Sequence, residues 1–187
     1  MKKLFQFSFI VMTVLLVWSC NAETKEAGST TEEATSGGGQ SAVRDDESAK
    51  DVVKVAAGSQ DHTTLVTAVK QAELVDALSN AGPFTVFAPT NAAFEKLPAG
   101  TVDDLMKPEN KEKLQDILQY HVFLANLSTT LMQDGQTLNQ VNGGNITIQK
   151  SADGKVKINN KATIVASIPA SNGVIHVIDE VLLPPSK

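Results

Sequence analysis

The sequence predicts an α+β domain in which helices pack on an antiparallel β-sandwich or wedge. Over residues 51–119, apolar residues recur mostly at helical spacing. Beyond Gly135, short segments alternate apolar and polar residues and are separated by turn residues. Within the first region, residues 82–98 are typical of a strand that runs straight into a short helix. Helices followed by strands indicate the α+β class.

The first 19 residues are typical of a bacterial targeting signal. Lys2 and Lys3 make the start of the chain positively charged. Residues 4–17 then form an apolar run that is too short to span a bilayer. The run ends at Ser19-Cys20, which resembles a lipoprotein processing site where the cysteine becomes the acylated N-terminus. Cys20 is the only cysteine, so no intrachain disulfide can form and an acyl attachment point explains it best. The alternative is a plain secretory signal with an incidental cysteine.

Residues 20–50 are predicted to form the lipid anchor and a disordered tether. Residues 21–50 are rich in Gly, Ser, Thr, Ala and Glu and nearly lack large apolar side chains, so they cannot offset the entropy of ordering. A flexible chain of this length reaches roughly 30 Å. The membrane is therefore the expected partner through acylated Cys20. The expected location is the bacterial envelope, as an outer-membrane lipoprotein facing the periplasm or the cell surface.

Residues 51–187 form one domain, which opens with helical segments. Asp51 is placed to cap a helix over 51–57, and Asp61 to cap a long one over 61–81. Thr101 and Asp104 resemble a capping box that opens a short helix to residue 107. An amphipathic helix over 109–119 then leads into Tyr120-His121.

The stretch 82–98 is the most densely specified part of the domain. Residues 84–88 favour a strand, and Pro89 is expected where its ladder ends. Thr90 or Asn91 then caps a helix that Pro98 stops. The large aromatic side chains of this stretch predict the centre of the core in this one corner: Phe84, Phe87 and Phe94.

The C-terminal part carries the strand signals. Residues 146–149 and 156–159 alternate on either side of Asp153-Gly154, which predicts a hairpin with one buried face. A strand over 162–168 is followed by a turn over 169–173. Residues 174–183 are apolar on both faces, so that strand is expected in the middle of a sheet or between two layers.

Three motifs in this order resemble the fasciclin (FAS1) family. Residues 84–94 (FTVFAPTNAAF) look like its first signature, Tyr120-His121 matches its central pair, and residues 172–184 (NGVIHVIDEVLLP) look like its second signature. The resemblance covers about residues 51–185. It implies a β-sandwich wedge of about seven strands with helices packed on one side, a role in adhesion or protein binding, and no cofactor.

The chain departs from the family pattern at two places. Animal members have an Asp-Ile pair linked to integrin binding before the second signature, where this sequence has Ser167-Ile168. The small turn that commonly follows the central pair is replaced by residues 124–127. Integrin-type recognition is therefore not carried over, although the fold is.

The residues give little support to catalysis or to nucleic-acid binding. His62, His121 and His176 lack metal-ligand spacing, and no Gly-X-Ser-X-Gly elbow is present. Ser171, His176 and Asp179 lie too close in sequence to form a triad. The net charge of −5 without a basic cluster gives no support to nucleic-acid binding. We expect no catalytic residue, metal or cofactor; a hydrolase stays an alternative because triads assemble from distant residues.

The expected function is a membrane-anchored module that binds an unidentified protein or polysaccharide. Residues 167–172 offer apolar and polar groups in a loop braced by Pro169 and Gly173, so little entropy would be lost on contact. The predicted binding surface comprises Tyr120, His121, Ser167, Ile168, Ser171 and Asn172. The predicted structural residues are Phe84, Phe87, Thr90, Asn91, Phe94 and His176.

Several alternatives remain open at this stage. Tyr120 and Ile168 could be packed in the core, and His121 and His176 could be buried neutral imidazoles bonded to backbone groups. His62 is expected to be exposed in the first turn of a helix. A passive envelope component or a polymer-associated accessory protein is the alternative function.

Overall fold

A computed structural model of the chain describes residues 49–185. The predicted signal peptide, Cys20 and the tether up to residue 48 lie outside the described residues. The helices are α1 (Val52–Ala57), η2 (Gln60–His62), α2 (Thr63–Gln71), α3 (Val75–Ser79), α4 (Asn91–Glu95), α5 (Thr101–Leu105), η3 (Pro108–Asn110) and α6 (Lys111–Tyr120). The strands are β1 (Phe84–Pro89), β2 (Val122–Phe123), β3 (Thr137–Asn139), β4 (Asn145–Lys150), β5 (Val156–Ile158), β6 (Ala162–Ala170) and β7 (Gly173–Ile178).

The helix starts are only partly those that the sequence predicts. Asp51 caps α1, because its side chain accepts a hydrogen bond from the Lys54 amide at 2.8 Å. The predicted cap at Asp61 is wrong, since Asp61 lies inside η2 and the side chain of Ser59 caps that turn. The capping box is also wrong: Thr101 already lies inside α5, which follows the left-handed Gly100.

The single long helix predicted over 61–81 is wrong, because the chain breaks it at Glu73. Glu73 adopts a left-handed conformation with φ of 57°, and the amide of Leu74 donates to the Val69 carbonyl at 3.1 Å. This is the hydrogen bonding of a Schellman motif, which ends α2 and redirects the chain into α3. The apolar periodicity continues across the break, so the pattern alone does not show it.

Thr90 and Asn91 together organise the turn from β1 into α4. Of the two predicted candidates, Thr90 is the one that caps α4, by accepting a hydrogen bond from the Ala93 amide at 3.2 Å. Asn91 acts on a different helix: its side-chain oxygen accepts from the Thr64 amide at 3.0 Å, and its amide donates to the Gln60 carbonyl at 2.9 Å. Asn91 therefore supplies the cap that the start of α2 lacks in its own sequence.

The strands form one mixed sheet in the order β2-β1-β7-β6-β5-β4-β3. The predicted position of the last strand is confirmed, because β7 lies between β1 and β6. The pairing differs from the all-antiparallel expectation, since β1 and β7 run parallel while the other neighbours are antiparallel. Beyond β3, the Val141 amide donates to the Val122 carbonyl of β2 at 3.0 Å, so the sheet nearly closes on itself as a wedge-like barrel.

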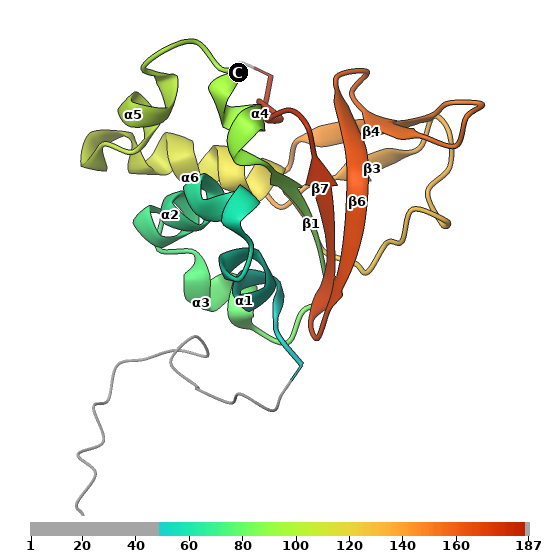
Figure 1. Ribbon diagram of the computed structural model, residues 1–187, viewed down its shortest axis with the longest axis horizontal. Helices are drawn as coiled ribbons and strands as arrows, with labels where there is room; N and C mark the ends of the chain where they lie inside the picture. Colours follow the sequence, from blue (N-terminus) through green and yellow to red (C-terminus); the bar gives the residue numbers. More distant parts are fainter. Residues whose placement is uncertain (1–48, 186–187) are drawn as a thin grey trace, which may run out of the picture. The chain divides into compact units, whose positions relative to one another are not determined.

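Helices cover one face of the β1–β7 pair, and the β3–β6 strands fold over the other, as Figure 1 shows. Two cores result. The helix-side core is Val52, Leu65, Ala68, Val69, Ala72, Ala88, Leu114, Leu118 and Ile175. The strand-side core is Phe87, Tyr120, Met132, Leu138, Ile146, Ile148, Val156, Ile158, Ala162, Ile178 and Leu182.

The predicted single aromatic corner is therefore wrong. Phe87 is fully buried in the strand-side core, whereas Phe94 is half-buried against the helix-side core and Phe84 is half-buried at the start of β1. Alternation along β1 is the reason, because successive side chains of a strand point to opposite faces. The three rings are therefore close in sequence but do not pack together in one cluster.

We predict that Phe87→Ala lowers the free energy of unfolding by about 3 to 5 kcal/mol, because it leaves a cavity in a packed core. Urea denaturation measures the loss. Val165→Ala is the control, since Val165 is 59% exposed and should change stability little. Equal effects of the two substitutions would show that Phe87 does not lie at the centre of the strand-side core.

Candidate binding surface

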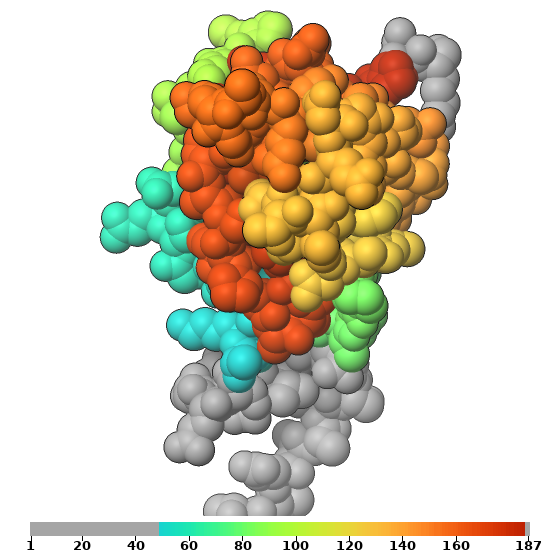
Figure 2. All heavy atoms as spheres, turned by 90° about the vertical axis from the view of Figure 1, so that its right-hand side faces the viewer, coloured from blue at the N-terminus to red at the C-terminus, as the bar shows by residue number. Residues whose placement is uncertain are grey.

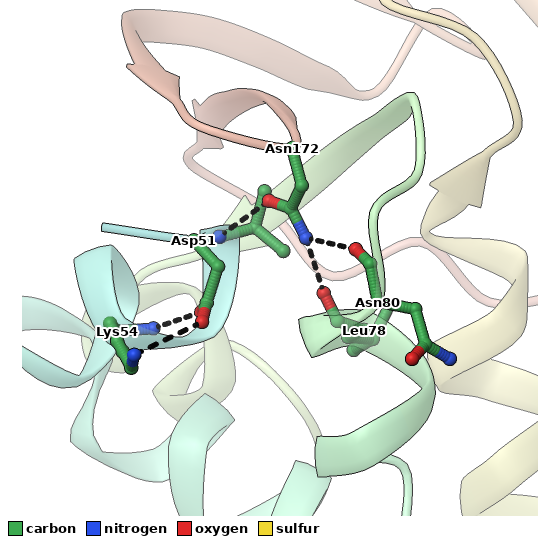
Figure 3. Close-up of polar contacts among 6 residues, drawn as sticks. Asp51, Lys54, Leu78, Asn80 and Asn172 are labelled. Carbon is green, nitrogen blue, oxygen red and sulfur yellow. Dashed lines mark hydrogen bonds and ion pairs between the residues drawn. The ribbon is translucent and has the colours of Figure 1, made fainter. Parts of the chain in front are cut away.

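The turn between β6 and β7 is fastened by the side chain of Asn172. Its oxygen accepts from the Val52 amide at 2.9 Å, and its amide donates to the carbonyls of Leu78 and Asn80, each at 2.8 Å (Figure 3). Asn172 is 9% exposed, so it is not available as the surface residue that the sequence predicted. It joins the start of α1, the end of α3 and the β6–β7 turn instead.

Gly173 lets this turn pass close to β1. A Cβ atom at Gly173 would collide with the backbone carbonyl of Phe84, its partner in the parallel ladder. On the other side of the turn, the Ser171 amide donates to the Lys50 carbonyl at 3.0 Å while the Ser171 residue stays exposed. The turn therefore presents Ser171 on a braced backbone.

The rest of the predicted loop belongs to a strand. β6 continues through Pro169 to Ala170, so the expected turn over 169–173 shortens to Ser171 and Asn172. Ile168 pairs with Ile175 and packs against the helix-side core, which confirms the alternative in which it is a core residue. Pro169 is tolerated because β5 pairs only with the beginning of β6, so no neighbouring strand needs its amide.

Ser167 and His176 form a polar pair on the strand side of the sheet. The His176 ring lies 2.8 Å from the Leu127 carbonyl through Nε2 and 2.8 Å from the Ser167 hydroxyl through Nδ1. A carbonyl can only accept, so Nε2 carries the proton and Nδ1 accepts from Ser167. Burial lowers the pKa of His176, and the hydrogen bond to the Leu127 carbonyl opposes this shift only in part. The ring therefore stays neutral near pH 7. The structural prediction for His176 is confirmed by these contacts.

Thr85, on the neighbouring strand β1, also binds the segment that follows β2. Its hydroxyl donates to the Ala125 carbonyl at 2.6 Å and accepts from the Leu127 amide at 2.9 Å. Thr85 and His176 together satisfy both backbone groups of Leu127, so they hold the irregular segment after β2 against the sheet. Sequence reasoning missed Thr85, because a threonine in a strand pattern carries no sign of a distant backbone partner.

Tyr120 and His121 are buried, at 2% and 3% exposed, so neither can contact a partner directly. The Tyr120 hydroxyl donates to the Asn145 carbonyl at 2.8 Å and accepts from the side-chain Nδ2 of Asn159 at 3.1 Å. His121 donates from Nδ1 to the Ile117 carbonyl at 2.8 Å and accepts the Leu182 amide at Nε2 at 3.0 Å. The packing alternative for both residues is confirmed, and they do not join the exposed serines in one surface.

His62 corrects another prediction, since it is 4% exposed and not on the surface. Its Nδ1 lies 2.8 Å from the Ser59 hydroxyl, and its Nε2 has no hydrogen-bond partner among the described residues. Burial lowers the pKa of His62, against the attraction of Asp61. His62 ends the short 3-10 turn η2, in which it is the buried residue.

One apolar cleft was not foreseen from the sequence. Leu124 and Val141 are 65% and 41% exposed and line a cavity of about 130 Å³ together with Phe84 and Leu78. The cavity lies between α3 and the edge strand β2, which are far apart in sequence. Because each apolar residue alone fits a core pattern, only the tertiary arrangement shows that these stay exposed.

The described part of the chain contains no group of three or more His, Cys, Asp or Glu side chains that could hold a metal ion. Within residues 49–185, no helix has the length and apolar character needed to cross a membrane. The polar side chains of the motifs instead bind backbone groups. What remains accessible at the predicted surface is Ser167, Pro169 and Ser171.

These features define a class of domain: a mixed seven-stranded sheet, helices on one face, and buried polar residues that tie irregular segments to the two central strands. The fasciclin domain model matches residues 60–184. The chain therefore belongs to the fasciclin domain family.

Relatives share most of this domain. "Protein sll1483" of Synechocystis sp. is 54% identical over 139 residues, covering 74% of this chain and 76% of that protein. "Immunogenic protein MPB70" of Mycobacterium bovis is 38% identical over 144 residues, covering 73% of this chain and 71% of that protein. "Cell surface glycolipoprotein MPB83" of Mycobacterium bovis is 40% identical over 114 residues, covering 61% of this chain and 49% of that protein.

A solved structure shares the fold. It is the FAS1 domain pair from the insect cell adhesion molecule Fasciclin I, which superimposes with a TM-score of 0.64 at 20% sequence identity. The match covers 72% of this chain and 51% of that chain, so this chain spans about half of the solved pair. At this identity the likeness shows the fold alone.

We predict that the domain loses stability as the pH falls from about 6.5 toward 4. Burial lowers the pKa of His121 from 6.5 to about 4. The unfolded chain then binds the proton more readily, so the stabilisation is complete above pH 6.5 and is lost as the pH falls through this window. The shift corresponds to about 3 kcal/mol. Urea denaturation at about pH 7.5 and about pH 4.5 measures it.

His62 and His176 should add to this loss, because burial lowers their pKa values as well. Hydrogen bonds from Lys107 and Lys155 hold the pKa values of Asp104 and Asp153 below their ordinary range, so these exposed carboxylates stay charged in this window. The control is His121→Gln, which should be less stable at neutral pH but lose less on acidification. Equal stability of the parent at both pH values would contradict the prediction.

Proposed function

We propose that this chain is a binding or adhesion module of the bacterial cell envelope that has no catalytic activity. The supporting observation is that every polar side-chain atom of Asn172, His121 and His176 is hydrogen-bonded within the domain. Their partners are backbone groups, except that His176 Nδ1 accepts from the Ser167 hydroxyl. Such side chains stabilise a scaffold and leave recognition to the exposed surface. Membership of the fasciclin domain family and the relative named a cell surface glycolipoprotein support a role at the cell envelope.

The proposal includes a lipid anchor at Cys20. The positive start, the apolar run and Ser19-Cys20 support it, as does the relative named a cell surface glycolipoprotein in Mycobacterium bovis. Two or more acyl chains hold a protein stably at a bilayer, where one chain binds only marginally. Residues 21–50 would then space the domain from the outer membrane, on its periplasmic or its outer face.

We predict that Cys20→Ala releases the protein from the membrane or leaves it unprocessed. Fractionation of cells into membrane and soluble parts, followed by blotting, measures the change, and mass spectrometry of the parent's N-terminus detects the acyl chains. Ser19→Ala is the control, since a small residue remains before Cys20. Membrane association that survives Cys20→Ala unchanged would exclude the acyl anchor.

The proposed contact surface is the accessible part of the β6 end and its turn: Ser167, Pro169 and Ser171. We predict that Ser171→Arg lowers binding to isolated envelope fragments, because it adds a bulky charge on a backbone held by Lys50 and Asn172. Thr67→Arg, on the exposed side of α2, is the matched control. Both variants should melt like the parent, because neither position lies in the core.

Saturable cosedimentation of the full-length protein with envelope fragments is the measurement. Binding that is saturable in the parent and weakened only by Ser171→Arg supports the module and its surface. An equal effect of both variants would remove the turn from the contact surface. Absence of saturable binding by the parent would favour the alternative, a passive envelope component.

A further inference from the structure

A second surface lies on the outer face of the β4–β5–β6 strands. Gln149, Lys157 and Thr163 form one row across the three strands, because Gln149 pairs with Lys157 and Lys157 pairs with Thr163. Their neighbours Ile148 and Ile158 are fully buried and point into the strand-side core. Alternation along each strand therefore turns the row of Gln149, Lys157 and Thr163 away from the core.

This surface reverses the charge of the protein. The chain has a net charge of −5, yet residues 145–163 contain four lysines and one acid, Asp153. Figure 2 looks onto this side of the domain, where the orange segments include these strands. The lysines are spread over residues 150–161 and form no continuous run, so the sequence pattern alone does not indicate a charged surface.

Two of the four lysines have no internal partner. Lys155 pairs with Asp153 at 3.2 Å, and the Lys150 ammonium donates to the Met132 carbonyl at 3.2 Å. The ammonium groups of Lys157 and Lys161 form no hydrogen bond or ion pair with the described residues. Lys157 lies in the outward row and Lys161 lies in the exposed turn before β6, whereas Lys150 pairs with the buried Val156 and so lies on the other side of β4 from Gln149. Unpaired charges of one sign attract a ligand of the opposite sign.

Nearby acids leave this charge largely uncompensated. Asp153 is engaged with Lys155. Asp179, which follows β7, accepts the Thr163 amide through Oδ1 at 2.6 Å. Asp134 accepts the Lys150 amide at 2.8 Å, and the other described acids, apart from Glu180, lie in residues 51–116.

We propose that the outward row of Gln149, Lys157 and Thr163, with Lys161 in the adjoining β5–β6 turn, binds an anionic polysaccharide. The lysines would pair with carboxylate or sulfate groups. The Thr163 hydroxyl would bond sugar hydroxyls, as would the side-chain nitrogen of Gln149, whose oxygen already accepts from the Asn160 amide at 2.8 Å. Val165, 59% exposed at the β6 bulge, adds an apolar surface next to the row. The inference rests on the proposed binding role and gives it a ligand class at a surface separate from the β6–β7 turn.

The composition of this side favours an acidic sugar polymer over nucleic acid and over neutral glycans. Residues 124–185 contain neither arginine nor an aromatic residue. Single-stranded nucleic acid is bound by stacking on aromatic rings and by arginine. A face of lysine, glutamine and threonine has no stacking platform, so charge must supply most of the selectivity.

The test uses the full-length protein in detergent micelles, with polygalacturonate as the anionic probe and dextran as the neutral one. Affinity electrophoresis or calorimetry should show binding to polygalacturonate only, weakened by added salt because exposed charges are screened. The double variant Lys157→Gln/Lys161→Gln should bind about tenfold more weakly, from the loss of two exposed ion pairs. Lys70→Gln/Lys113→Gln on the helical side is the matched control and should bind like the parent.

Three results would overturn this inference: no binding of polygalacturonate by the parent, equal weakening by both double variants, or tighter binding of single-stranded DNA than of polygalacturonate. Melting temperatures of both double variants check that their folds are intact. Saturable binding to envelope fragments that persists when polygalacturonate fails would leave the proposed binding role standing. Loss of both would remove the role as well.

Discussion

The parallel pairing of β1 with β7 is the constraint on which the rest of the structure depends. It joins residues 84–89 to residues 173–178, so the two signature motifs become the centre of one sheet. Each of these strands is covered on both faces, by helices on one side and by the β3–β6 strands on the other. Gly173 is needed at the first step of the ladder, where a side chain would collide with Phe84.

Buried polar side chains at these central strands hold the irregular segments in place. Asn172, Thr85 and His176 bind backbone groups of the α1 start and of the segment that follows β2. Buried amides and carbonyls outside regular structure need partners, and each unpaired group costs roughly 1 to 3 kcal/mol. The histidines can serve only as neutral rings here, which couples the stability of the fold to pH.

In this arrangement, the residues that build the domain are different from the residues that face solvent. Residues that identify the domain in sequence are mostly those that build it, so they say little about the ligand. The proposed recognition sites use positions outside both cores, such as the exposed Ser171 at the β6–β7 turn and the half-buried Lys157 on the outer face of the sheet. Those positions can change without loss of the fold, because surface substitutions away from caps and the core usually alter stability little.

The sequence by itself determined the fold class, the cap at Thr90, the β4–β5 hairpin and the family. Each depends on a local pattern: a capping side chain three residues from its amide, or alternation on both sides of a turn. Only the tertiary structure decided the parallel β1–β7 pair, the break at Glu73, the burial of Asn172 and His62, and the outward row of Gln149, Lys157 and Thr163. Those features depend on which distant backbone groups and strands meet, and a pattern within a short window carries no information about such partners.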